Sequence, residues 1–379
     1  MLSMINFLRS GRFVLLIYAL PCFELLSLRS HFLKSSKESS LLFGHKFIEH
    51  SYHSQVGYRS NNINTFLVGD SHDSDLSTDA TMYPFVILPG FGNDATDYSN
   101  PLGMGSEISI QQNLLNCGIK SVEIVPIVRN DWLKIISGVF TIDFWKSQCK
   151  PTTLFGFYCK AVDAKVRQIY RDTGKPVVLV GHSAGGWLAR ALLANGTWAE
   201  PNQNSSSADL NLDYIESSKL VMGLITLGSP HYPPQEGFPD MTRGALQYVS
   251  RNFPGAFLYN SPHNIFYMTV AGTAVKGNHT AEKGTTTKFA SDSYLQVTGD
   301  RNNMGNELGD GIVPLKSAHL DDALQITLSN AWHSIQAPEN MWYGGNMLII
   351  NQWLPQALKL IEETAMTRQR SIKEILVEK

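Results

Sequence analysis

The stretch "PVVLVGHSAGGWLAR" (residues 176–190) places one serine between an apolar run and a helix-like run. The apolar run is typical of a buried parallel strand. In a strand–Gly-x-Ser-x-Gly–helix sequence, the serine occupies a strained tight turn and its hydroxyl stands free of the sheet. Gly181 and Gly185 leave room for that turn around Ser183, and Gly186 adds more. The stretch predicts a nucleophilic serine, and the alternative is a tight turn without chemistry.

A nucleophilic serine needs a base, and the base needs an acid that orients it. With this kind of turn, both follow later in the chain, the acid before the histidine. Asp310 in "LGDGIVPLKSA" lies between glycines before an apolar segment, and we expect it to be the acid. His333 in "ITLSNAWHSI" follows the last predicted strand, and we expect it to be the general base. The alternatives are an Asp–Gly turn and a surface or core histidine.

The chain contains rivals for both roles. Asp292, Asp300 and Asp321 are weaker acid candidates, because none has the loop context of Asp310. His319 is the main rival for the base, but it precedes the last predicted strand.

A glycine-containing loop, "LPGFGND" (residues 88–94), follows the first predicted strand. In enzymes with such a serine, one oxyanion-binding N–H comes from the residue after the nucleophile and another from this loop. We therefore expect Ala184 and Phe91 to supply the two N–H groups, with Gly92 and Asn93 adjacent. The alternative is a simple turn.

Strand-like and helix-like segments alternate from residue 83 onward, which predicts βαβ units and a mostly parallel sheet. We expect a helix that ends near Gly118, and Pro355 is a candidate for a kink in a helical tail. Strands are expected at 84–90, 121–127, 176–180, 220–230, 264–272 and 323–328, and further helices at 157–175 and after Ser183.

Two segments interrupt this alternation, residues 129–156 and 231–263. Each follows a predicted strand, so each belongs at the carboxyl edge of the sheet, where ligands bind. They form either an apolar rim or small lid, or additional surface helices.

The first 80 residues form a separate region. Arg9 and Arg12 precede an interrupted apolar run (13–28), and a Ser-rich, basic segment (29–40) follows. This pattern favours an organelle transit peptide, chloroplast being one destination, over a secretory signal or membrane anchor. We expect 1–80 to be a targeting segment and polar linker, poorly ordered, and 81–379 to be the catalytic domain.

Charge and cysteine spacing narrow the function classes. The net charge of −2 does not favour nucleic-acid binding. The four cysteines have no CxxC spacing and no HExxH occurs, so metal binding is not expected. For Cys149 and Cys159, buried free thiols are favoured over a disulfide.

The Ser183, Asp310, His333 order, the 88–93 loop and "ITLGSPH" (residues 225–231) resemble the lipase/esterase branch of the α/β-hydrolase superfamily. The last segment is similar to one in triacylglycerol lipases and GPI inositol-deacylase-like proteins. This chain has Pro89 where many members have histidine, which preserves the backbone donor. His231 is interpreted as structural.

The resemblance implies an α/β-hydrolase fold, with a mostly parallel central sheet flanked by helices and small lid-like insertions. It also implies a serine hydrolase of carboxylic esters, of lipid or other apolar acyl substrates, that works through an acyl-enzyme without metal or cofactor. Association with a membrane surface and the oligomeric state stay open. Acyl transfer by the same triad and a non-catalytic ligand-binding protein are the alternatives.

Overall fold

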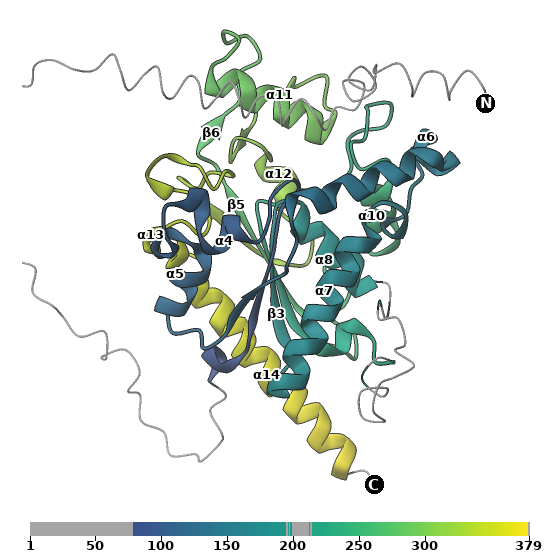
Figure 1. The fold of residues 1–379 in the computed structure, drawn as a ribbon, viewed down its shortest axis with the longest axis vertical. Coiled ribbons are helices and arrows are strands. Elements are labelled where there is room, and N and C mark those ends of the chain that lie inside the picture. The colour runs from purple at the N-terminus through teal and green to yellow at the C-terminus, as the bar shows by residue number, and fades with distance from the viewer. Residues whose placement is uncertain (1–78, 195, 197, 199–211, 213, 378–379) are drawn as a thin grey trace, which may run out of the picture. The chain divides into compact units, whose positions relative to one another are not determined.

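The computed structural model describes residues 79–194, 196, 198, 212 and 214–377 (Figure 1). The predicted targeting segment and linker, residues 1–80, lie almost entirely outside these residues, as does Cys22. Those predictions therefore stay predictions. The first described element is the short 3₁₀ helix η1 (Ala80–Met82), whose first turn is capped by the Asp79 carboxylate.

A parallel sheet forms the centre of the described chain. Its six strands lie in the order β2-β1-β3-β4-β5-β8, and every neighbouring pair is parallel. This confirms the predicted parallel sheet. The strands β1, β3, β4 and β5 are buried along their whole length, which explains their continuous apolar runs. The bounds are β1 (Phe85–Leu88), β2 (Val122–Ile124), β3 (Val177–His182), β4 (Val221–Leu227), β5 (Phe266–Gly272) and β8 (Leu324–Leu328).

The strand order reverses direction between β1 and β3. From β1 the chain moves outward to β2, and then returns to place β3 on the other side of β1. The connections that leave neighbouring strands at such a switch point go to opposite faces of the sheet and open a crevice at its carboxyl edge. The loop after β1 and the turn after β3 therefore meet at this crevice.

Helices cover both faces of the sheet (Figure 1). On one face, α7 (Pro151–Thr173) and α8 (Ala184–Ala194) pack together and against β3. On the other, α5 (Ile110–Asn116) and α14 (Leu354–Val377) share one hydrophobic core with the sheet. Proline at the first position begins α7, and Gly174 in a left-handed conformation ends it.

The helical tail contains a break, but not at Pro355. One helix, α13 (Met347–Ile350), ends before α14 begins at Leu354. Pro355 therefore lies in the first turn of α14, where its missing N–H leaves no intrahelical bond unmade. The suggested kink at this proline is wrong.

The two predicted insertions form short helices. Residues 129–156 contain η4 (Arg129–Phe140), α6 (Ile142–Trp145) and the start of α7, and residues 231–263 contain α10 (Ala245–Asn252). A third excursion, not predicted, comprises α11 (Thr286–Thr298) and the antiparallel pair β6 (Val275–Lys276) and β7 (Leu308–Gly309). The remaining short elements are α4 (Thr96–Ser99), η2 (Pro101–Gly103), η3 (Ser106–Ile108), η5 (Ser217–Leu220), α12 (Leu315–Ala318) and η6 (Pro338–Asn340).

Two further properties concern the cysteines and the helices of the described residues. Cys117, Cys149 and Cys159 are free thiols, so the disulfide alternative for Cys149 and Cys159 is wrong. No described helix combines the length and the apolar composition needed to cross a bilayer.

A buried ion pair fixes α7 to the segment before β4. The Arg167 Nε lies 2.7 Å from Asp163 Oδ2, and both side chains are almost fully buried. The Ser217 hydroxyl also donates to Asp163 Oδ1, at 2.5 Å. Another Arg167 N–H donates to the carbonyl of Ile215 at 2.9 Å. Because both charges are bonded, neither is left uncompensated in the interior.

We expect Asp163→Asn to lower the free energy of unfolding by about 3–5 kcal/mol, because the buried Arg167 charge loses its partner. Urea denaturation followed by circular dichroism measures this change. The matched control is Asp172→Asn, which removes an exposed carboxylate from the same helix. A loss of about 0.5 kcal/mol or less in Asp163→Asn, the size usual for exposed positions, would contradict the assigned role.

Candidate active site

Ser183 occupies the turn between β3 and α8 in a strained backbone conformation. Its φ is +53°, in the left-handed region that non-glycine residues rarely adopt. The Ser183 N–H donates to the carbonyl of Leu227 at 2.9 Å, and the Gly186 N–H donates to the Ser183 carbonyl at 3.1 Å. These bonds hold the turn against β4 and against the first turn of α8.

The glycines around Ser183 are required by close backbone packing. A Cβ added at Gly181 would lie 2.5 Å from the Gly186 Cα. A Cβ at Gly185 would overlap the Leu88 carbonyl oxygen, and one at Gly186 would overlap the Ser229 hydroxyl. Gly181 and Gly185 are therefore required by close packing, as predicted, and Gly186 is needed for contact with the chain after β4.

The structure brings Ser183, His333 and Asp310 together. The His333 Nε2 lies 2.9 Å from Ser183 Oγ, and the His333 Nδ1 lies 2.8 Å from Asp310 Oδ2. A carboxylate only accepts hydrogen bonds, so the Nδ1 of neutral His333 carries the proton. Its Nε2 is then free to accept a hydrogen bond from the serine hydroxyl. The His333 N–H also donates to the Asp310 carbonyl, at 2.9 Å.

The Asp310 carboxylate is buried among hydrogen-bond donors. Its Oδ1 accepts from the N–H groups of Ile312 and Val313, at 3.0 and 2.8 Å. Its Oδ2 accepts from the Tyr343 hydroxyl at 2.7 Å, in addition to His333. These donors make the ionised form tolerable in the interior and fix the direction of the carboxylate.

Sequence reasoning missed Tyr343. Its hydroxyl accepts from the Gly272 N–H at 2.8 Å and donates to Asp310. Burial, followed by the nearby Asp310 carboxylate, raises the pKa of Tyr343 well above its ordinary value, so it stays a donor. No motif surrounds this tyrosine, and only the folded chain shows the contact.

The rival residues have other partners. Asp292 pairs with Lys288 on the surface of α11. His319 contacts the hydroxyls of Thr269 and Thr327, at 2.9 and 3.0 Å. Asp300 lies 3.6 Å from the Lys316 ammonium, and the Asp321 N–H donates to the Tyr232 hydroxyl. The structure places none of these contacts at Ser183.

His231 is fully buried in the turn after β4, and its Nε2 lies 3.1 Å from the Thr226 hydroxyl. Burial lowers the pKa of His231 well below its ordinary value, so it is neutral. This environment agrees with a structural interpretation.

The loop after β1 lies directly against the serine. A Cβ added at Gly90 would lie 2.9 Å from the Ser183 Cβ. Phe91 occupies the tip of a turn in which the Asn93 N–H donates to the Gly90 carbonyl at 3.1 Å. Ala184 begins α8, so its N–H has no intrahelical acceptor. Gly90 and Ala184 therefore lie beside Ser183, and Phe91 follows Gly90 in the chain. The oxyanion-binding role of Phe91 and Ala184 stays a prediction.

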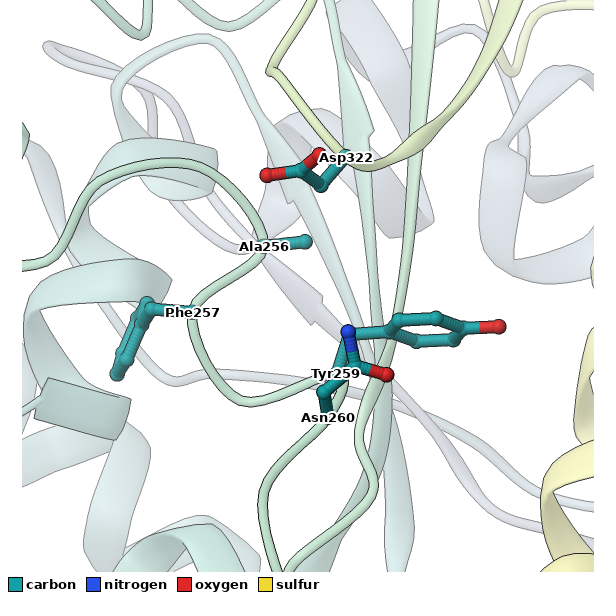
Figure 2. Close-up of a pocket in the computed structure, with 5 residues that line it drawn as sticks. All are labelled: Ala256, Phe257, Tyr259, Asn260 and Asp322. Atoms are coloured by element: carbon teal, nitrogen blue, oxygen red, sulfur yellow. The ribbon is translucent and has the colours of Figure 1, made fainter.

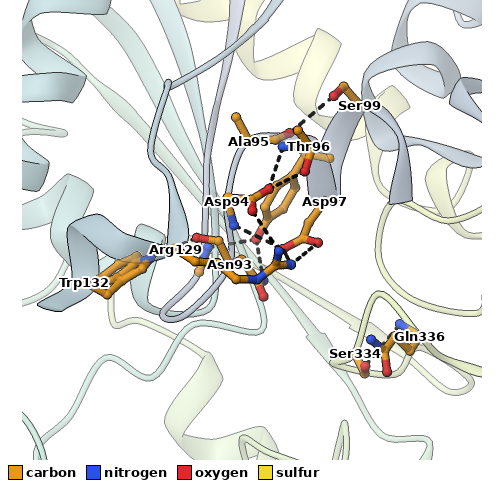
Figure 3. Close-up of polar contacts among 12 residues, drawn as sticks. Asn93, Asp94, Ala95, Thr96, Asp97, Ser99, Arg129, Trp132, Ser334 and Gln336 are labelled. Carbon is orange, nitrogen blue, oxygen red and sulfur yellow. Dashed lines mark hydrogen bonds and ion pairs between the residues drawn. The ribbon is translucent and has the colours of Figure 1, made fainter. Parts of the chain in front are cut away.

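Polar contacts attach the 129–156 insertion to this loop (Figure 3). The Arg129 guanidinium lies 2.8 Å from Asp94 Oδ2 and 2.6 Å from Asp97 Oδ1. The Trp132 indole N–H donates to the Asn93 carbonyl at 2.9 Å, and its ring meets that of Phe91 edge to face, 4.9 Å between centroids. The insertion therefore contacts the loop that carries Phe91.

Two observations concern ligands. Within the described residues, no group of three or more His, Cys, Asp or Glu side chains is arranged to hold a metal ion. A cavity of about 330 Å³ is lined by Ala256, Phe257, Tyr259, Asn260 and Asp322 (Figure 2). These residues belong to segments that lead into β5 and β8, whereas Ser183 follows β3.

This chain is similar in structure to several solved lipases and to a phospholipase. Neither the family models nor the curated proteins compared with this sequence matched it. The chain is similar to a mature lipase from Bacillus licheniformis, with 17% identity and a TM-score of 0.42 over 76% of this chain and 96% of that one. A Staphylococcus hyicus lipase has 14% identity and a TM-score of 0.40, over 81% and 99%. A Legionella pneumophila phospholipase, solved with thio-NAD, has 10% identity and a TM-score of 0.42, over 78% and 63%.

Because these identities are low, the fold is assigned from the geometry of this chain. The parallel strands switch direction between β1 and β3, with helices on both faces. A strained serine lies at the strand-to-helix turn, and aspartate and then histidine follow later in the chain. The chain therefore has the α/β-hydrolase fold.

Proposed function

We propose that the protein is a serine hydrolase that cleaves carboxylic esters with apolar acyl groups, lipid esters in particular. The observation that carries this proposal is the continuous hydrogen-bonded series from Ser183 through His333 to Asp310. A serine hydroxyl is a weak nucleophile by itself, and this arrangement supplies the base and the group that orients the base.

The first step acylates the serine. The His333 Nε2 takes the hydroxyl proton while Ser183 Oγ bonds to the ester carbonyl carbon. The negative charge that develops on the carbonyl oxygen is stabilised by the N–H groups of Phe91 and Ala184. The C–O bond to the alcohol then breaks, and His333 returns its proton to the departing alcohol oxygen.

The second step releases the acid. His333 takes a proton from water, whose oxygen attacks the acyl carbon, and the proton returns to Ser183 Oγ as the ester bond to the enzyme breaks. Asp310 holds the imidazole in the required tautomer and stabilises its cation in both steps. The hydrogen bonds from Ile312, Val313 and Tyr343 keep the carboxylate in place.

An exposed apolar surface supports a lipid substrate. We define the apolar rim as Phe140, Ile142 and Trp145, whose exposed fractions are 84%, 69% and 68%. Three large apolar side chains this exposed and this close in sequence indicate contact with another apolar phase. The rim belongs to the same insertion whose Arg129 and Trp132 contact the Phe91 loop, so the chain links this apolar surface to the site.

Labelling with a fluorophosphonate probe tests the nucleophile. We expect the wild-type protein to react and Ser183→Ala to be unreactive, because the probe bonds only to an activated serine oxygen. The control is Ser137→Ala, which removes an exposed hydroxyl elsewhere and should label like wild type. Equal labelling of Ser183→Ala would refute the nucleophile assignment. A folded wild-type protein that neither labels nor hydrolyses esters would favour the non-catalytic alternative.

Substitutions at the acid test its role. We expect Asp310→Asn to lower kcat by about 10,000-fold, because an amide can stabilise the wrong imidazole tautomer. Tyr343→Phe removes one hydrogen bond to a charged group, about 1.5–3 kcal/mol, and should lower kcat by about 10- to 100-fold. Asp292→Asn, an exposed position on α11, serves as control. Wild-type kcat in folded Asp310→Asn would remove this residue from the mechanism.

Ester chain length and the apolar rim test the substrate class. With p-nitrophenyl esters we expect activity to increase from acetate to long acyl chains, because added methylenes bury more apolar surface. A Phe140→Ser/Trp145→Ser double variant should lose activity on long-chain esters in vesicles and retain it on soluble acetate. The control is Leu348→Ser, which is 74% exposed on α13, away from α6 (Figure 1). Activity confined to acetate would exclude a lipid substrate.

A further inference from the structure

The residue before the nucleophile, His182, is a buried histidine with both ring nitrogens bonded. Its Nδ1 lies 2.8 Å from the Tyr98 hydroxyl, and its Nε2 lies 3.0 Å from the main-chain oxygen of His333. Its side chain is not part of the series from Ser183 to Asp310. The Gly-x-Ser-x-Gly pattern allows any residue at position 182, so the presence of histidine there needs a separate explanation.

The donors around Tyr98 determine the tautomer of His182. The Tyr98 hydroxyl accepts from the Gly90 N–H at 2.8 Å and from the Asn93 side-chain amide at 3.0 Å. The Gly90 N–H and the Asn93 NH₂ group only donate, and the His333 carbonyl at Nε2 only accepts, so the Tyr98 O–H donates to His182 Nδ1. The Nε2 of His182 therefore carries the ring proton and donates it to the His333 carbonyl.

The environment keeps this ring neutral. Burial, followed by the neighbouring His333, lowers the pKa of His182 well below its ordinary value. The two imidazole rings lie 4.9 Å apart, centroid to centroid. Since His333 becomes a cation during the proposed reaction, a second cation at His182 would oppose that step, and a neutral donor does not.

The bonded groups join three segments that are far apart in sequence. Gly90 belongs to the loop after β1, His182 to the end of β3, and His333 to the loop after β8. In the sheet, β4 and β5 separate β3 from β8. The hydrogen bonds of Tyr98 and His182 therefore link the Phe91 loop to the His333 loop across the end of β3.

We propose that His182 and Tyr98 are positioning residues that hold the His333 loop and the Phe91 loop in register with Ser183. Gly90 packs closely against the His182 ring, because a Cβ at Gly90 would lie 3.2 Å from His182 Nδ1. The ring of Trp342 also packs against His182, at 5.5 Å between centroids. For catalysis the proposal rests on the proposed function, but its structural part can be measured without activity.

The kinetic test compares His182→Phe, His182→Gln and Tyr98→Phe. We expect His182→Phe to lower kcat by about 100-fold with KM nearly unchanged, because a displacement near 1 Å has an effect of that size. Glutamine keeps one acceptor and one donor, so His182→Gln should restore most of kcat. The Tyr98→Phe and His182→Phe effects should not multiply in the double variant, because both break the same series of bonds.

His231→Phe is the matched control, since it also removes a buried neutral imidazole, but one whose ring bonds Thr226 and neither of the two loops. It should lower thermal stability comparably and leave kcat near wild type. Equal kcat losses in His182→Phe and His231→Phe would overturn the proposal, as would a wild-type kcat in His182→Phe. If His182→Phe does not fold, Tyr98→Phe takes its place in the test. An unchanged kcat in Tyr98→Phe would then overturn the proposal.

Hydrogen exchange separates this proposal from the proposed function. In a Ser183→Ala background, we expect His182→Phe to speed amide exchange by about tenfold or more in both 89–93 and 331–335, through local opening. His231→Phe should leave both segments unchanged. Unchanged exchange in both loops would refute the positioning role even if the enzyme is a hydrolase. Faster exchange in these variants, together with a folded wild-type protein that hydrolyses no ester, would support the positioning role and count against the proposed function.

Discussion

Close backbone contact at the strand-to-helix turn is the constraint around which the site is built. Ser183 adopts a positive φ, and α8 begins so near to β1 and β4 that a Cβ at Gly185 or Gly186 would overlap neighbouring atoms. The strain persists because β3 is buried along its length and paired on both sides. Other arrangements of the turn would break these strand pairs or remove the helix from the sheet.

The buried polar groups next to this turn are bonded. Asp310 has four donors, and the ring nitrogens of His182 and His333 all have partners. Buried polar groups without partners are costly, so a bonded network also specifies one geometry. The same hydrogen bonds therefore stabilise the interior and set the distances between the proposed catalytic groups.

The 129–156 insertion contacts the buried site at one end and is exposed to solvent at the other. One end contacts the Phe91 loop through Trp132 and the Arg129 ion pairs, whereas Phe140, Ile142 and Trp145 remain exposed. The Arg129 pairs are partly exposed, so they contribute less to stability than the buried pair on α7. The Arg129 ion pairs instead fix where the insertion contacts the loop.

The sequence by itself determined the parallel sheet, the glycine requirement at the turn and the candidate residues Ser183, Asp310 and His333. These signals are local, since they arise from apolar runs, glycine spacing and order along the chain. Local patterns did not reveal α11, the β6–β7 pair, Tyr343, Tyr98 or the partners of His182. The β6–β7 pair and the hydrogen bonds of Tyr343, Tyr98 and His182 depend on contacts between residues that only the fold brings together.

Tertiary structure also decided between alternatives that the sequence left open. It placed Asp310 at His333 while Asp292 pairs with Lys288, and it left Cys149 and Cys159 as free thiols. It placed Pro355 in the first turn of a helix. The physical reason is common to all these cases: a residue's chemistry is set by its burial and its bonded partners, and neither can be read from its neighbours in sequence.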